Sequence, residues 1–318
     1  MTRDGVPIEL YGNIGRPEEA AQVMASGLAG VGLFRTEFLV LDAAQPPTLE
    51  HQAAIYGQAL QALGDKPLVI RTWDLGGDKI PPFLWPQVQG RPIAQVRGLR
   101  FTLDYAPELL AVQLQAIVQA AARGSADQVR VLVPMVLGAS DLRRARDQLR
   151  RLASAAGVAA PPLGAMLETP AALFGLPAIL ALVDFANVGT NDLTRYLLAT
   201  ERAVIETVPG YSLLHPAVLA ALHTILQAMP EDQPPVCLCG EAAGDPALAC
   251  LLVGLGVRSL SMTPRRAAAV RYALGQVRSQ DLAALAQEAL AAGGIPEVQT
   301  LLRRQIPKAI LGQFGRIR

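Results

Sequence analysis

Eight short apolar runs alternate along this chain with longer stretches rich in Ala and Leu. This alternation limits the possible folds more than any other feature of the sequence. Such runs predict buried β-strands, and the stretches between them predict helices. Strands that alternate with helices form parallel sheets with right-handed crossovers. The predicted strands cover residues 8–14, 32–38, 68–74, 130–136, 163–169, 185–189, 236–240 and 259–262.

Eight strand–helix units in 318 residues predict an α/β chain folded as a (β/α)8 barrel. An open, doubly wound sheet is the alternative, because periodicity does not show whether a sheet closes. We expect the barrel over residues 1–278 and a helical tail over 279–318, which is either the last part of the barrel or an oligomer contact. The clearest helical patterns cover residues 17–28, 141–155, 216–229 and 245–255.

The composition is that of an ordered globular protein, with 51% hydrophobic and only 17% charged residues. A formal net charge of +1 gives no sign of a nucleic-acid-binding surface. No apolar stretch reaches the roughly 18 residues of a membrane span, and the N-terminus lacks the apolar core of a signal peptide. Three cysteines indicate no disulfide framework. We therefore expect a cytoplasmic protein that binds neither nucleic acid nor membrane.

Polar side chains follow one predicted strand after another, at the end where the strand runs into a loop. In a (β/α)8 barrel the functional groups gather at this C-terminal face, which predicts a site there. The residues are Arg35, Thr36 and Glu37 after the second predicted strand, Arg71 and Asp74 after the third, Glu168 after the fifth, Asn191 and Asp192 after the sixth, and Cys239 and Glu241 after the seventh.

Two arginines interrupt otherwise apolar strands, and a buried guanidinium needs a negative partner. Arg35 and Arg71 therefore either clamp an anionic ligand or form structural ion pairs, for example between Arg35 and Glu37 or Asp74. The Gly-Gly-Asp-Lys segment at 76–79 is either a loop that approaches a phosphate or an ordinary turn with a solvated lysine.

Two carboxylates end neighbouring strands, which lie about 4.8 Å apart in a sheet. Glu168 and Asp192 at that separation suit one Mg²⁺, which commonly takes one or two carboxylates and leaves its other positions to water and substrate phosphate. The alternative is that Asp192 or Asn191 only caps the next helix.

Cys237 and Cys239 share one face of a predicted strand, so burial of both is the simplest interpretation. Cys239 at the strand end is alternatively a thiol acid or base. An arginine cluster, two carboxylates and a thiol at one mouth together suit a small anionic substrate bound through Mg²⁺.

These motifs resemble, in order, those of the phosphoenolpyruvate (PEP)-binding barrel of Enzyme I of the bacterial sugar phosphotransferase system. The similarity runs from about Ile8 to Pro264 and implies a barrel of the PEP/pyruvate-binding type. Its segments are GVGLFRTEFLVLD at 30–42, VIRTWDLGGDK at 69–79, RGLR at 97–100, VPMV at 133–136, LETP at 167–170, GTNDLTRY at 189–196 and CGEAAGD at 239–245.

The resemblance implies a role for each matching residue. It implies that the phosphate is clamped by Arg35, Arg71 and Arg202, and that Arg97 is a further active-site arginine. It implies that Mg²⁺ is bound by Glu168 and Asp192 and that the ligand also contacts the amide of Asn191. The implied proton donor to the enolate carbon is Cys239.

The resemblance also implies an enzyme that transfers a phosphoryl group from PEP to a histidine and releases pyruvate. This chain has no Gly-Gly-x-x-Ser-His-like stretch, so we expect the acceptor histidine domain and an HPr-like phosphocarrier to act in trans. A homodimer is implied as well. The alternatives are a Mg²⁺-dependent pyruvate or oxaloacetate lyase and a non-catalytic PEP-sensing module.

Overall fold

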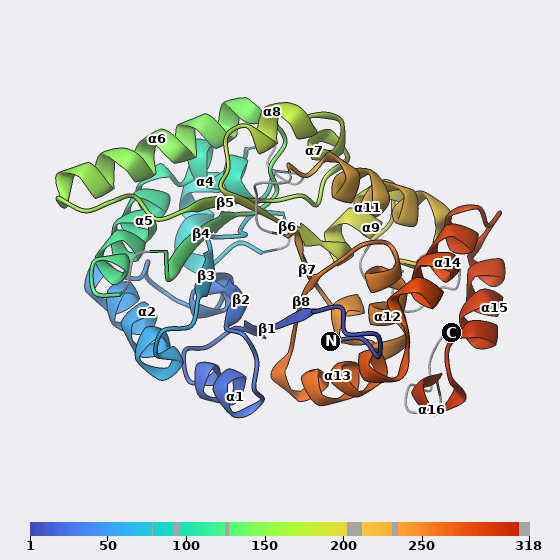
Figure 1. Ribbon diagram of the computed structural model, residues 1–318. Helices are drawn as coiled ribbons and strands as arrows, with labels where there is room; N and C mark the ends of the chain where they lie inside the picture. The colour runs from blue at the N-terminus through green and yellow to red at the C-terminus, as the bar shows by residue number, and fades with distance from the viewer. Residues whose placement is uncertain (78, 92–95, 125–126, 202–211, 231–234, 312–318) are drawn as a thin grey trace.

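The computed structural model describes residues 1–77, 79–91, 96–124, 127–201, 212–230 and 235–311. Eight parallel strands form one closed barrel in sequential order, with β1 paired to both β2 and β8 (Figure 1). The (β/α)8 prediction is confirmed, and the open sheet is excluded. The strands are β1 (Glu9–Ile14), β2 (Val31–Arg35), β3 (Leu68–Arg71), β4 (Val129–Val133), β5 (Leu163–Met166), β6 (Phe185–Gly189), β7 (Cys237–Cys239) and β8 (Ser259–Met262).

Most strands end earlier than the apolar pattern indicates. Strand β2 stops at Arg35, and the next four residues form the 3-10 helix η1 (Thr36–Leu39). Strands β3 and β5 each stop three residues before the predicted end. The polar residues that close these runs therefore lie at the strand ends or just beyond them, next to the barrel mouth.

Helices follow the strands and cover the outside of the barrel (Figure 1). The helical patterns predicted at 141–155 and 216–229 appear within two residues of their predicted bounds. The helices are α1 (Glu19–Ala25), α2 (Leu49–Leu63), α3 (Trp85–Val88), α4 (Gly98–Tyr105), α5 (Pro107–Ala121), α6 (Ala139–Ala155), α7 (Pro170–Phe174), α8 (Leu176–Leu180), α9 (Thr190–Leu197), α11 (Pro216–Ala228), α12 (Pro246–Gly254), α13 (Ala267–Gln276), α14 (Ser279–Leu290), α15 (Ile295–Gln305) and α16 (Lys308–Leu311), with short 3-10 turns η2 (Pro82–Leu84), η3 (Ala242–Gly244) and η4 (Pro264–Arg266).

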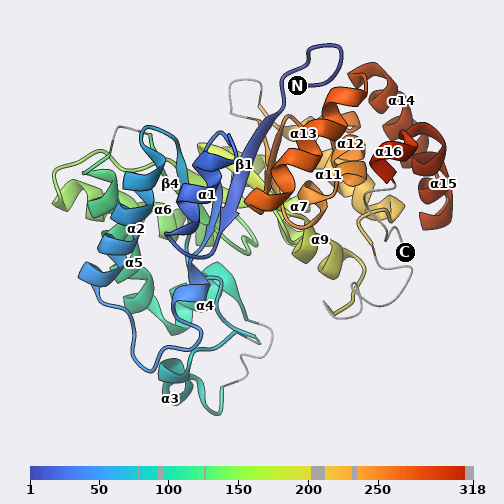
Figure 2. The same ribbon diagram turned by 90° about the horizontal axis from the view of Figure 1, so that it is seen from below.

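Apolar side chains pack on both faces of the barrel wall. The large outer cluster lies between the strands and the helices. A separate cluster around the fully buried Trp73 supports the segment between β3 and α5. Figure 2 shows β1 running from the N-terminus towards α3 and α4, so this segment covers the C-terminal end of the barrel. The interior cluster consists of Leu33, Val69, Leu132, Met166, Phe185, Cys237 and Cys239, with Tyr11 against it.

The helices after residue 278 pack directly on the barrel helices. Leu282, Leu285 and Ala286 of α14 are buried, and α14 lies against α12. The division of the chain at 278/279 stays a prediction. Among the described residues, no helix has both the length and the apolar character needed to cross a bilayer.

We predict that Gly254→Ala destabilises the protein by roughly 1–3 kcal/mol. A Cβ on Gly254 of α12 would collide with the backbone of Leu282 in α14, so the two helices would have to separate. Urea unfolding measures the change. Gly275→Ala in α13 is the control, because a Cβ there meets nothing within 4 Å. That substitution should stabilise by up to about 1 kcal/mol through helix propensity. Equal stabilities of the two variants would contradict the close packing of α14.

Candidate active site

A cavity of about 150 Å³ opens at the C-terminal ends of the strands. Its walls come from the residues at and after the ends of β2, β3, β5, β6 and β7, and from the segment that leads into α4. Arg202 lies outside the described residues. The other residues to which the resemblance gives a role all line this cavity: Arg35, Arg71, Arg97, Glu168, Asn191, Asp192 and Cys239. Of the remaining strand-end residues, Glu37 and Asp74 line the cavity, whereas Thr36 and Glu241 are not in its lining.

Buried neutral polar groups fix the ends of β2 and β3. Arg35 and Arg71 are paired in register, and the Thr36 hydroxyl donates to the carbonyl oxygen of Arg71 at 2.7 Å. Gln113 of α5 donates to the Thr36 hydroxyl at 3.0 Å and accepts from the backbone N–H of Trp73 at 2.9 Å. These bonds fix the points at which the two arginine side chains leave the barrel wall.

Asp74 is the centre of an ion-pair network that joins three cationic side chains. Its carboxylate accepts from Arg97 Nε at 2.9 Å and Nη2 at 2.7 Å. One of its oxygens lies 3.2 Å from Arg71 Nη2 and 3.3 Å from Lys79 Nζ. Glu37 pairs with Arg71 and, at 3.4 Å, with Lys79. Burial opposes ionisation of Asp74, but Arg71 and the other cations hold its pKa below the ordinary range.

These pairs answer part of what the sequence left open, since Arg71 forms structural ion pairs with Glu37 and Asp74. Glu37 and Asp74, which were candidate partners of Arg35, pair with Arg71, Lys79 and Arg97. Lys79 is not a solvated turn charge, because its ammonium group lies between two buried carboxylates.

Glu168 is fully buried two residues beyond β5. Its Oε1 accepts a hydrogen bond from the backbone N–H of Met135 at 2.8 Å. Its Oε2 lies against Gly189, where a Cβ would collide with it. Burial and the negative charges of Asp192 and Asp74 raise the pKa of Glu168 to about 8. Two carboxyl groups that repel each other in this way would be stabilised by a cation between them.

Asp192 lies in the first turn of α9, whose N-cap residue is Gly189 and has no side-chain cap. It is therefore not the capping residue that the alternative interpretation required. Its Oδ1 accepts from Arg97 Nη1 at 2.8 Å. Across the described part of the chain, no group of three His, Cys, Asp or Glu side chains forms a ready metal site. Glu168 and Asp192 still fit Mg²⁺, which needs only one or two protein carboxylates.

Cys239 is buried at the end of β7 and faces the cavity. Asn187 Nδ2 donates to its Sγ at 3.4 Å. A hydrogen bond from the Cys237 thiol lowers the pKa of Cys239, and the positive charge of Arg35 acts in the same direction against the effect of burial. Cys237 is therefore a direct neighbour of the candidate acid as well as a packed strand residue.

Three site contacts were absent from the sequence prediction. Asn187 gave a weak signal, since it is an amide inside an otherwise apolar predicted strand. Gln113 gave a similar one, as a polar residue on the buried face of a helix. The backbone N–H of Met135 gave none, because a main-chain donor does not depend on the residue type.

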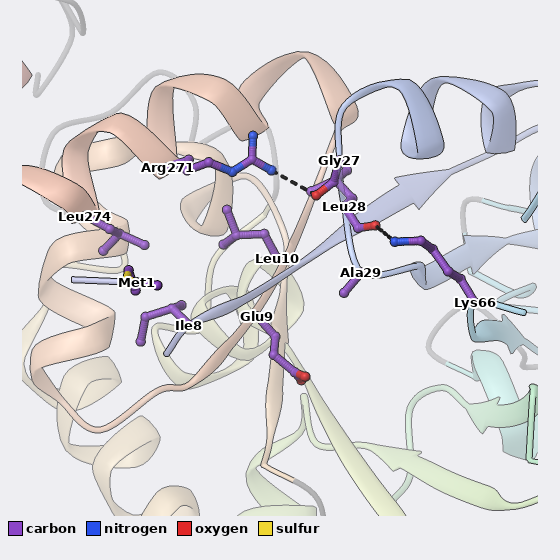
Figure 3. Close-up of a pocket in the computed structure, with 10 residues that line it drawn as sticks. All are labelled: Met1, Ile8, Glu9, Leu10, Gly27, Leu28, Ala29, Lys66, Arg271 and Leu274. Atoms are coloured by element: carbon purple, nitrogen blue, oxygen red, sulfur yellow. Dashed lines mark hydrogen bonds between the residues drawn. The ribbon is translucent and has the colours of Figure 1, made fainter. Parts of the chain in front are cut away.

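A second cavity of about 240 Å³ lies at the opposite, N-terminal end of the barrel (Figure 3). Its walls include the apolar side chains of Ile8 and Leu10. Its two cationic side chains bond to main-chain carbonyls: Arg271 to that of Gly27 at 3.1 Å and Lys66 to that of Leu28 at 2.8 Å (Figure 3). These bonds hold the turn between α1 and β2, which indicates a role in stability.

Comparison of the sequence with known proteins identifies one family and several relatives of that family. Residues 1–279 match the family model described as "PEP-utilising enzyme, PEP-binding domain". The phosphoenolpyruvate-protein phosphotransferase of Haloferax volcanii is 38% identical over 306 residues, covering 95% of this chain and 54% of that protein. The multiphosphoryl transfer protein of Rhodobacter capsulatus is 38% identical over 301 residues, covering 95% of this chain and 36% of that protein.

The chain thus spans about half or less of the length of these relatives. Among solved structures, an HpcH/HpaI aldolase/citrate lyase family protein from Burkholderia cenocepacia is 15% identical, with a TM-score of 0.48. The two chains overlap over 85% of this chain and 93% of the other. A likeness at that level says nothing of function.

We predict that, with a chelator present, the free energy of unfolding falls as pH rises from about 5 to about 8. The Glu168 pKa is about 8 in the folded protein and near its ordinary value, about 4.3, in the unfolded chain. Between these values the folded state binds a proton that the unfolded state lacks, so stability is lost as pH rises, by at most about 1.4 kcal/mol per pH unit. Urea unfolding at several pH values measures the slope.

Glu168→Gln is the control for this pH dependence. The amide oxygen can still accept from Met135, but the group no longer titrates. The variant should lose this part of the slope. The same slope in both proteins would assign it to other groups.

Proposed function

The chain belongs to the family of PEP-binding domains of PEP-utilising enzymes, and on that premise we propose that it is the catalytic barrel of a PEP–protein phosphotransferase. It takes the phosphoryl group from PEP, passes it to a histidine on a separate domain, and releases pyruvate. One observation carries the proposal: four cationic side chains and a buried thiol line one cavity together with two mutually repelling carboxyl groups.

The charge in the cavity suits a metal-bound anion better than a free one. Its described walls hold four cationic residues (Arg35, Arg71, Lys79 and Arg97) and four acidic ones (Glu37, Asp74, Glu168 and Asp192). PEP carries about three negative charges near neutral pH, since a phosphate monoester bears nearly two and a carboxylate one. The carboxylates offset much of the attraction of the cations, although the raised pKa of Glu168 leaves that group largely protonated near neutral pH until a cation binds. We therefore propose that PEP enters with a divalent cation, which reduces its charge to about −1.

We propose Mg²⁺ as the cation and Glu168 and Asp192 as its ligands. When bound, Mg²⁺ neutralises charge on the phosphate and on the oxygen that becomes the enolate. Asp192 has to leave Arg97 for this, and Glu168 has to lose its proton. Arg97, once released from Asp192, still has Asp74 as a partner and can direct its free N–H groups at the substrate.

The arginines at the ends of β2 and β3 orient the phosphoryl group. Their guanidinium forks match phosphate oxygens, and we assign Arg35, Arg71 and Arg202 to this clamp and Asn191 to a second contact with the ligand. The bond between phosphorus and the enol oxygen breaks as a bond to the histidine nitrogen forms. The electron pair stays on the oxygen as an enolate, whose C3 then takes a proton.

We assign that proton to Cys239. The thiol S–H bond breaks as the new C3–H bond forms, and the sulfur keeps the electron pair as a thiolate. The thiol is buried beside the cavity, and Arg35 favours the thiolate that the transfer leaves behind. A buried acid of this kind has a use in enolate protonation that a sensing module would not need.

We propose that the histidine domain and an HPr-like phosphocarrier act as partners, and that the chain works in the cytoplasm as a homodimer. The relatives named above are phosphotransfer proteins, in line with such partners. Sedimentation should give a species of twice the mass of the chain. A single species of one chain's mass at micromolar concentration would remove the dimer from this proposal.

We predict that both carboxylates are needed for PEP to bind. Calorimetry with Mg²⁺ should show a loss of PEP affinity of roughly tenfold to a hundredfold for Glu168→Gln and for Asp192→Asn, because each removes a charge-assisted ligand. Asp104→Asn removes a carboxylate from an exposed pair with Arg144 and should bind PEP like the wild type. Unchanged affinity in either site variant would overturn the metal assignment.

We predict that Cys239→Ala binds PEP nearly normally but turns over roughly 10²–10⁴ times more slowly, the usual contribution of a positioned acid. The assay measures pyruvate release with a histidine acceptor domain added in trans. Cys250→Ala is the matched control, because Cys250 is equally buried but lies in α12, outside the cavity lining. Equal rates for the two variants would make Cys239 a packing residue.

A further inference from the structure

Asn187 spans the interior of the barrel from β6. Its side chain is buried, and its Nδ2 donates to the carbonyl oxygen of Gly32 on β2 at 3.1 Å and to Cys239 Sγ on β7 at 3.4 Å. Strand β7 is the neighbour of β6 in the barrel, but β2 is not. One amide group therefore connects the thiol to a distant strand of the wall.

The layer around this amide is closely packed. A Cβ on Gly32 would lie 2.6 Å from Ser261 Oγ and 2.8 Å from Tyr11 Cβ, so the interior has no space there for a further side chain. The backbone that accepts from the Asn187 amide is therefore held in place. Each of the two N–H hydrogens of that amide also has its own acceptor.

The hydrogen bond to the Gly32 carbonyl oxygen fixes the orientation of the Asn187 amide. The N–H that points at Cys239 therefore keeps its direction whatever the thiol does. We propose that Asn187 is a positioning residue for Cys239: it holds the sulfur from one side, so that the thiol proton is presented to the cavity. This inference rests on the proposed function, in which Cys239 protonates C3 of the enolate. The Thr190 hydroxyl completes the arrangement by donating to the Cys239 carbonyl oxygen at 3.1 Å.

Orientation is the contribution that distinguishes Asn187 from the charged neighbours of the thiol. Arg35 and Arg71 favour a thiolate through their charge, and that attraction has no preferred direction at the sulfur. An N–H···S hydrogen bond is directional and is stronger to a thiolate than to a thiol. Its loss should therefore affect both the rate of proton delivery and the face of the enolate that receives the proton.

The test is turnover of PEP that is deuterated at one C3 position, in tritiated water, with the histidine acceptor domain added in trans. The chirality of the pyruvate methyl group reports the face of protonation. Asn187→Leu has a similar volume but no N–H donor. It should lower kcat roughly tenfold to a hundredfold, leave the KM for PEP within about twofold, and give a nearly racemic methyl group. In a Cys239→Ala background it should have no further effect on kcat.

Asn13→Leu is the matched control. Asn13 is also a buried barrel amide, but its Nδ2 donates to the Ser261 carbonyl oxygen on β8 at 3.1 Å rather than to the Cys239 sulfur. It should keep the chirality of the product. Asn187→Ser, which is too short to reach from Gly32 to the sulfur, replaces Asn187→Leu if the larger side chain prevents folding.

These variants distinguish failure of the positioning role from failure of the proposed function. Retained chirality and rate in a folded Asn187 variant would overturn the positioning role while leaving the thiol assignment intact. Retained chirality in Cys239→Ala, or no turnover by the wild type, would overturn the proposed function itself. A racemic product from Asn13→Leu would show that any change in the interior has the same effect, and would also overturn the role of Asn187.

Discussion

The cavity depends on one electrostatic constraint: buried cations have to be paired before a ligand arrives. Asp74 meets this need for Arg71, Lys79 and Arg97 at once, and Glu37 adds a second partner for Arg71 and Lys79. Without these carboxylates, several positive charges would face one another in a space shielded from water. The arrangement keeps donors in position for an anion, but it also weakens the pull on a free anion.

The same constraint applies to Asp192, whose carboxylate pairs with Arg97. Without ligand it pairs with Arg97, and in the proposed metal site it would be a ligand beside Glu168. Binding would therefore exchange one set of ion pairs for another. The one new charge would be that of Glu168, which has to lose its proton, and a cation beside it would compensate that charge.

Much of this could be predicted from the sequence, for identifiable reasons. The alternating runs determine the parallel barrel, and a polar residue at one strand end after another indicates which face carries the site. The limits of the strands were less accurate, since apolar residues such as Phe38 and Leu167 continue into the loops. The contacts of Asn187, Gln113 and Met135 could not be predicted, because each joins segments at least 33 residues apart that come together only in the folded chain.

Barrel closure has a consequence for how the site comes into being during synthesis. Strand β8 is the last to be synthesised, and it pairs with β1, the first strand of the chain, which the Asn13–Ser261 contact also joins to it. While the growing chain on the ribosome lacks residues 259–262, β7 has only one of its neighbours and β1 has only β2. Cys239 at the end of β7 then lacks its neighbouring strand β8. The ability of the cavity to bind its ligand should therefore appear in one late step, the pairing of β8 with β7 and β1, rather than strand by strand.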